Sequence, residues 1–336
     1  MLLNEMPRLL LDSGRRSIVP AALFAITTAC GGGSTPPPNE PDDMAILQEQ
    51  EEGQSNDKVL AASNAEVQRG MDALKANNFA EAERIFAQAR IDAPNDAQAA
   101  HYHGVALEGL ERFDEAVDSY KKAIELEPKL LASPQNLSAL LQSLERYQES
   151  LSVAEAGLKV DPEDPGLLIN RAYAVDLLGD PEKANPEALA AYEKALKAAP
   201  DNLNLRYYYA RALAVAGDKE KALTQLSKLP LDGIEVPVVE IVAVYNQLGA
   251  FAECDQVLST KIAEDKTVEL LIYRSSCRLG NKDEKGAEAD LREAVATDES
   301  SAVAHLYLAR YLAKVGKKAE AKKHLDKANA LKAAEK

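Results

Sequence analysis

Three cysteines and four histidines are among the residues of this chain that could ligate a metal or supply a nucleophile. The histidines are His101, His103, His305 and His324, and their spacing is not that of a metal site on a helix. No serine or cysteine lies in a recognisable nucleophile elbow, and no glycine-rich phosphate loop follows a strand pattern. The sequence therefore predicts no catalytic residue, no metal site and no cofactor.

Cys254 and Cys277 are expected on two successive helices joined by a turn near Asp265, from which they are almost equally distant. In an antiparallel helix pair, two such residues lie at the same height, so helix rotation decides whether their sulfur atoms meet. Two interpretations follow. Either a disulfide forms, which requires an oxidising compartment, or Cys254 serves as a small apolar residue.

Cys30 follows a segment typical of export signals. Arg15 and Arg16 precede an apolar run over residues 18–29, and this run of about twelve residues is too short to cross a bilayer as a helix. The run ends in Ala29, and three glycines follow Cys30. This pattern resembles the lipobox of bacterial lipoproteins, although Thr27 stands where that family prefers leucine. The resemblance implies a signal peptide over residues 1–29 and lipid attachment to Cys30.

Other interpretations of the first residues remain open. The chain could be a secreted protein in which Cys30 is incidental. Arg15 and Arg16 could belong to a twin-arginine signal, although the expected pattern after them is missing, and translation could begin at Met6.

Residues 30–58 are predicted to be a lipidated cysteine followed by a disordered tether. The segment after Cys30 is rich in Gly, Ser and Pro, and it has seven acidic residues against Lys58. Its one apolar patch, residues 44–47, is too small to form a core but could dock on another surface. The net charge of the whole chain is −15, which argues against a nucleic-acid partner.

A 34-residue repeat begins in the segment 59–336. Pro94, Pro128 and Pro162 are 34 residues apart, and small and aromatic residues recur at the same step. Each period contains two apolar patterns of helical spacing separated by a short polar turn, which predicts a helical hairpin. The small residues Gly104 and Ala116 are expected where the two helices of one hairpin cross.

This pattern resembles the tetratricopeptide repeat, which residues 97–130 match at nearly every signature position. Later repeats are less regular, and a turn over residues 180–187 is longer. The resemblance implies an all-α, right-handed superhelical solenoid of about eight hairpins over residues 59–336. The lysine-rich residues 330–336 would extend the last helix as a polar cap.

In this family the ligand binds to the concave face, which the first helix of each hairpin lines. Alignment of the repeats places seven residues on or near that face: His101, Gln135, Tyr173, Tyr207, Arg211, Arg274 and Arg310. Tyrosine and arginine often anchor interfaces, although each of these residues could also be an ordinary exposed helix residue. The Lys and Asn pattern with which some family members clamp a peptide carboxylate is not found.

Taken together, the chain resembles the tetratricopeptide lipoproteins of Gram-negative bacteria, among them pilotin-type and cell-envelope adaptor lipoproteins. Gly31 stands where lipoproteins retained in the inner membrane commonly have aspartate, so the resemblance implies the periplasmic side of the outer membrane. We expect a non-catalytic scaffold that is held by its lipid and recruits or assembles envelope proteins through a protein or peptide ligand. The alternative is an accessory factor in polysaccharide or outer-membrane protein export, and an enzyme is the least favoured class.

Overall fold

The computed structural model describes residues 66–230 and 236–334. The predicted signal peptide, the lipid attachment at Cys30 and the tether over residues 30–58 lie outside these residues. Every regular element in the described part of the chain is a helix, which confirms the predicted all-α class. None of the described helices is both long enough and apolar enough to cross a membrane.

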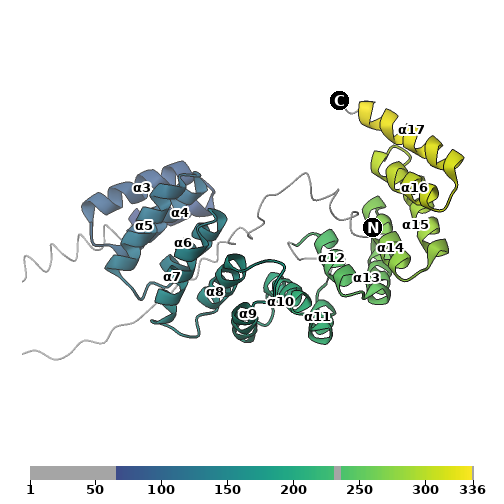
Figure 1. Cartoon of the computed structure of the whole chain (residues 1–336). Helices are drawn as coiled ribbons and strands as arrows, with labels where there is room; N and C mark the ends of the chain where they lie inside the picture. The colour runs from purple at the N-terminus through teal and green to yellow at the C-terminus, as the bar shows by residue number, and fades with distance from the viewer. Residues whose placement is uncertain (1–65, 231–235, 335–336) are drawn as a thin grey trace, which may run out of the picture. The chain divides into compact units, whose positions relative to one another are not determined.

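The helices follow one another in pairs, each joined by a short turn (Figure 1). The first helices of the pairs are residues 66–75, α4 (Ala97–Gly109), α6 (Ala132–Ser143), α8 (Pro165–Leu178), α10 (Leu203–Val215), α12 (Val238–Gln247), α14 (Val268–Gly280) and α16 (Ala302–Lys314). The second helices are α3 (Phe79–Asp92), α5 (Phe113–Leu126), α7 (Tyr147–Leu158), α9 (Pro186–Ala198), α11 (Lys219–Leu226), α13 (Phe251–Glu264), α15 (Glu284–Thr297) and α17 (Lys318–Ala334). The described residues thus form eight pairs, the number expected from the repeat.

These helices are divided between two compact units. The N-terminal unit contains residues 66–179 and 190–199, and the C-terminal unit contains residues 180–189 and the described residues from 200 to 334. Within each unit, successive helices pack on one another, as the close contacts of α4 with α5 and of α16 with α17 show.

A residue with a left-handed backbone conformation ends the first helix in seven of the described hairpins. The residue is glycine in three of them, at Gly217, Gly249 and Gly316. The other four have residues with a Cβ atom at this place, and their φ values are 55° for Asn77, 59° for Glu111, 59° for Glu145 and 64° for Lys282. This conformation reverses the chain, because it lets the next amide close the helix end. For example, the amide of Arg112 donates to the carbonyl of Leu107 at 2.9 Å.

Short polar side chains begin the first helices. Asp96 accepts hydrogen bonds from two backbone amides at the start of α4, and Asn202 accepts one at the start of α10. Thr267 and Ser301 do the same for α14 and α16. These caps satisfy amides that have no partner within the helix, so at these hairpins a polar residue fixes where the first helix starts. The helices α6 and α12 instead follow Leu131 and Pro237, which supply no side-chain cap.

The close helix crossing expected near Gly104 is present. A Cβ atom on Gly104 would lie 2.8 Å from the ring of Tyr120, which is too close for an ordinary contact. Tyr120 and Ala116 are fully buried, and Leu107 packs in the same core. The absence of a side chain at Gly104 therefore lets the Tyr120 ring fill the space between α4 and α5.

Candidate functional site

His101 lies inside a contact between two hairpins. Its side chain on α4 is buried, and Nδ1 is 3.1 Å from the hydroxyl of Ser133 on the next hairpin. The rings of Tyr102 and Tyr120 pack against the imidazole. Burial lowers the pKa of His101 to about 4, so the imidazole is neutral at pH 7. His101 thus contributes to packing between hairpins and offers little surface to a ligand.

Gln135 and Tyr207 also connect their own hairpin with the next one. The amide of Gln135 donates to both carboxylate oxygens of Asp164 at 2.8 Å, and Asp164 also caps α8. The hydroxyl of the buried Tyr207 donates to Glu240 at 3.1 Å. Burial, reinforced by the negative charge of Glu240, raises the pKa of Tyr207.

These three residues share one position in the repeat. His101, Gln135 and Tyr207 each lie ten residues before the left-handed residue that ends their helix. At this place a side chain points along the stack and reaches the start of the following hairpin. In these three hairpins, this position therefore supplies a polar contact to the following repeat.

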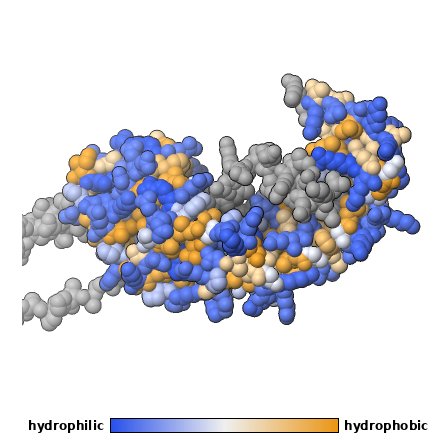
Figure 2. Space-filling model, viewed as in Figure 1, coloured by the Kyte–Doolittle hydropathy of each residue, from blue (hydrophilic) through white to orange (hydrophobic). Residues whose placement is uncertain are grey.

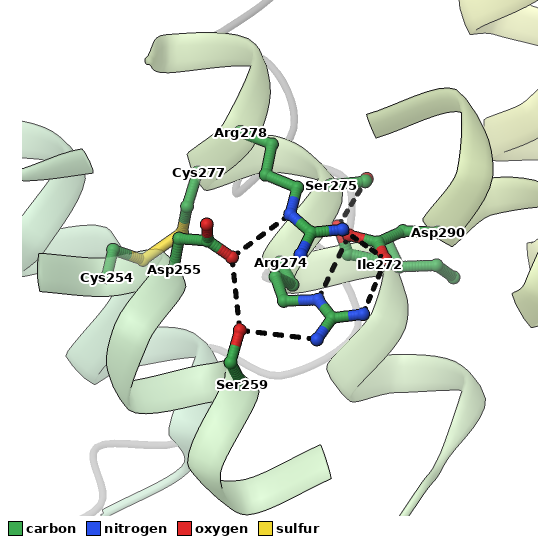
Figure 3. The surroundings of a disulfide bond; sticks show 9 residues. All are labelled: Cys254, Asp255, Ser259, Ile272, Arg274, Ser275, Cys277, Arg278 and Asp290. Carbon is green, nitrogen blue, oxygen red and sulfur yellow. Dashed lines mark hydrogen bonds and ion pairs between the residues drawn. A yellow bond between two sulfur atoms is a disulfide. The ribbon is translucent and has the colours of Figure 1, made fainter. Parts of the chain in front are cut away.

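Arg274 lies in an ion-pair cluster in the C-terminal unit (Figure 3). Its guanidinium contacts the buried carboxylate of Asp290 at 2.6 and 3.1 Å and donates to Ser259 at 3.2 Å. Arg278 donates to the same carboxylate at 2.7 Å and to Asp255 at 3.1 Å. The cluster joins α13, α14 and α15, and Arg274 donates within it to both Asp290 and Ser259.

A disulfide lies beside this cluster. It joins Cys254 on α13 to Cys277 on α14, with Cα atoms 5.9 Å apart, and both side chains are fully buried. Cys254 also stands where Ala116 and Ala222 are buried in other hairpins. Both interpretations of Cys254 thus describe its place: it is a small core residue and half of a covalent bond between two hairpins.

Arg211 and Arg310 remain from the predicted ligand-binding residues, and each lies over a tyrosine ring that was not among them. The guanidinium of Arg211 lies over the ring of Tyr208, 5.1 Å from its centre. Arg310 lies over the ring of Tyr307 at 5.9 Å. In both pairs the tyrosine is nine residues before the left-handed glycine, so the pairs hold equivalent positions of their hairpins. We call these two pairs the Tyr-Arg pairs.

The N-terminal unit has a different set at the equivalent positions. Tyr102, Asn136 and Asn170 follow one another at steps of 34 residues, and all three are partly exposed. Asn170 donates to the carbonyl of Gln135 at 2.9 Å. Tyr173, one turn after Asn170, is nearly buried and packs edge-on against another ring. Asn136 and Asn170 are not among the predicted ligand-binding residues, and their 34-residue step is the signal in the sequence that could identify them.

Two histidines form a separate pair in the last hairpin. Nδ1 of His305 lies 2.9 Å from Nδ1 of His324, and Nε2 of His305 lies 3.1 Å from the carbonyl oxygen of Glu299. Because that carbonyl can only accept, Nε2 of His305 donates to it. Among the described residues, no group of three or more His, Cys, Asp or Glu side chains could hold a metal ion.

Comparison with known proteins agrees with this architecture. Two family profiles, both described as tetratricopeptide repeat, match residues 67–130 and 179–233. No curated protein matches the sequence.

Solved structures are also similar to this chain. A tetratricopeptide repeat protein from Parabacteroides merdae ATCC 43184 is 16% identical, with a TM-score of 0.50 over 75% of this chain and 99% of that chain. PilF of Pseudomonas aeruginosa is 15% identical, with a TM-score of 0.49 over 76% and 99%. MamA from Desulfovibrio magneticus RS-1 is 20% identical, with a TM-score of 0.44 over 49% and 92%. The described part of the chain is therefore all-helical, and residues 67–130 and 179–233 are similar to tetratricopeptide repeats.

Proposed function

We propose that this chain is a non-catalytic scaffold of the cell envelope, which recruits or assembles envelope proteins through the first helices of its repeats. The observation that carries the proposal is the recurrence of the Tyr-Arg pair at equivalent positions of two hairpins, Tyr208 with Arg211 and Tyr307 with Arg310. Tyrosine and arginine dominate the binding energy of many protein interfaces. Tyr208, Arg211 and Arg310 are partly exposed and can offer contact area and hydrogen-bond donors, whereas Tyr307 is buried and supports Arg310 from within the core.

The disulfide supports the extracytoplasmic part of this proposal. Cys254 and Cys277 are the only cysteines of the chain besides Cys30, and disulfides persist in oxidising compartments such as the bacterial periplasm. The lipobox-like pattern at Cys30 supports anchoring, because two or more acyl chains hold a protein stably on a membrane. The proposed location is the periplasmic side of the outer membrane.

Affinity capture from envelope extracts tests the ligand-binding face. The variant Arg211→Ala with Arg310→Ala removes the cation of both Tyr-Arg pairs and leaves the buried residues between hairpins unchanged. Arg84→Ala is the matched control, because Arg84 is exposed and pairs with Glu81 on its own helix. Proteins retained by the wild type and the control but lost from the double variant would support the proposal.

Equal retention by all three proteins would exclude the Tyr-Arg pairs as the binding site, and capture of a polysaccharide alone would favour the export alternative. Mass spectrometry of the mature amino terminus tests the anchor separately. An unmodified Cys30 would contradict lipidation without affecting the binding result.

A further inference from the structure

The last hairpin, formed by α16 and α17, differs in charge from the rest of the chain. Residues 302–334 contain eight Lys and Arg residues against Glu320 and Asp326, which gives a net charge of +6. Residues 66–301 contain 26 Lys and Arg residues against 42 Asp and Glu residues, which gives −16. Positive charge is thus concentrated in the final hairpin of an otherwise acidic protein.

Most of this positive charge has no carboxylate partner among the described residues. Lys317 pairs with Glu288 at 2.6 Å, as lysines elsewhere pair across hairpins, for example Lys266 with Glu293 at 2.7 Å. Six exposed lysines of the last hairpin take part in none of the ion pairs found: Lys314, Lys318, Lys322, Lys323, Lys327 and Lys332. Their charges are available to an external partner.

The lysines of α17 lie around the exposed arc of the helix. Ala321 and Ala328 are the buried residues of α17, and Leu325 is 42% exposed. Lys318, Lys322 and Leu325 fall on the same side at helical spacing. Figure 2 shows hydrophilic and apolar residues intermingled on the visible face of this hairpin, at the upper right.

This arrangement suits a diffuse anionic surface better than a shaped ligand. A lysine ammonium group is a point charge that does not orient its partner as a guanidinium fork does. The lysines follow successive turns of α17 and do not converge on one point. Lysines around an exposed leucine are typical of helices that lie on membrane surfaces.

We propose that the exposed face of α17 docks on the anionic headgroups of a phospholipid bilayer. The proposal rests on the envelope anchoring of the proposed function, since an anchored chain is held within reach of a bilayer. The anionic bilayer repels the acidic residues 66–301, so the electrostatic free energy favours contact through the last hairpin. The chain then meets the membrane through its lipid and through its last helix.

Co-sedimentation of the full chain with vesicles tests the docking. One vesicle contains only phosphatidylcholine, and the other contains about 30% phosphatidylglycerol, a fraction sufficient for a negative surface potential. The neutral vesicle measures binding through the lipid on Cys30, or through the apolar residues 18–29 in a chain that keeps them, so the ratio of the two partition coefficients measures the electrostatic part. We expect a ratio of about ten or more, which falls toward one as salt is raised.

Two charge-matched variants locate the contact. Lys322→Glu, Lys323→Glu and Lys327→Glu together should reduce the ratio by about tenfold or more. The control carries the same three substitutions at exposed positions of the other unit, at Lys121, Lys129 and Lys159. It changes the net charge by the same amount and should keep most of the ratio. Circular dichroism checks that both variants remain helical. If the first variant does not, the same three lysines are replaced with glutamine instead of glutamate.

Equal losses in the two triple variants would overturn the proposal, because net charge alone would then explain the binding. A wild-type ratio of one would also overturn it. The proposal would equally fail if the protein bound an immobilised acidic peptide but showed no preference for anionic vesicles. The variant Cys30→Ser separates this inference from the anchor. If lipid is absent from the mature protein while Cys30→Ser keeps the wild-type ratio, the docking surface stands and the proposed anchor fails.

Discussion

Nδ1 of His101 lies 3.1 Å from the hydroxyl of Ser133, and this contact joins α4 to α6 through two buried side chains. Burial holds the pKa of His101 at about 4, below the ordinary value of 6.5. Between pH 6.5 and pH 4, the imidazole of His101 is therefore neutral in the folded state and protonated in the unfolded state. The stability from this residue is fully present above pH 6.5 and is lost as the pH falls through 4.

We expect the free energy of unfolding of the N-terminal unit to decrease by about 2 to 3 kcal/mol between pH 7 and pH 4.5 because of His101. Urea titrations of the wild type and of His101→Gln at the two pH values measure this difference. The variant should show a smaller dependence on pH. An unchanged dependence would mean that His101 is protonated without cost in the folded state.

Asp290 is the carboxylate that two arginines share in the C-terminal unit. Replacement with asparagine would leave Arg274 and Arg278 without their closest counter-charge in a mostly buried place. Loss of one partner from a buried ion pair typically costs about 3 to 5 kcal/mol. Thermal and urea unfolding of Asp290→Asn should show a loss of this order, whereas Asp255→Asn, at a more exposed carboxylate, should cost clearly less. Similar losses in the two variants would contradict the central role of Asp290.

Lys282 adopts a left-handed conformation, with a φ of 64°, at the turn before α15. Glycine takes this conformation without strain, and three other hairpins already have glycine there. We expect Lys282→Gly to raise the free energy of unfolding by about 0.5 to 1 kcal/mol. The control Lys285→Gly lies within α15 and should lower it by about 1 kcal/mol. A lower free energy of unfolding in Lys282→Gly would show that the lysine side chain stabilises the fold by more than the left-handed backbone conformation destabilises it.

The disulfide should stabilise the C-terminal unit chiefly by restricting its unfolded state. The two cysteines are 23 residues apart, and closure of a loop of this size stabilises a protein by about 2 to 4 kcal/mol. We expect a reducing agent to lower the urea midpoint of the wild type. The double variant Cys254→Ala with Cys277→Ala should show the lower midpoint with or without reductant. If the urea midpoint of the wild type is the same with and without reductant, the disulfide adds no stability.

The repeat made much of the fold predictable, because its core positions depend on contacts within one hairpin. Gly104 and Tyr120 recur in series that the sequence displays, and they meet as the spacing requires. The orientation of His101 and Tyr207 was harder to predict. Their position lies between the predicted ligand-binding side of the first helix and the side that packs on the next hairpin. A partner 32 or 33 residues away decides where the side chain points.

The arginine cluster shows a second reason why sequence was insufficient. Arg274 aligns near the predicted ligand-binding face, but its guanidinium is paired with Asp290 on the neighbouring helix. Other hairpins have no buried carboxylate at the position of Asp290. A pair unique to one repeat leaves no periodic signal. Tyr307 and Arg310, by contrast, are neighbours on one helix, so their pairing follows from a spacing of three residues.

The bond between Cys254 and Cys277 also changes how the chain responds to mechanical force. A pull on the two ends would straighten each hairpin in turn, but the segment between the cysteines would remain a closed loop. The oxidised chain would reach a length shorter by about 80 Å than the reduced one, since 23 residues extend by about 3.3 to 3.6 Å each. The bond therefore sets an upper limit to the length of the unfolded chain under load.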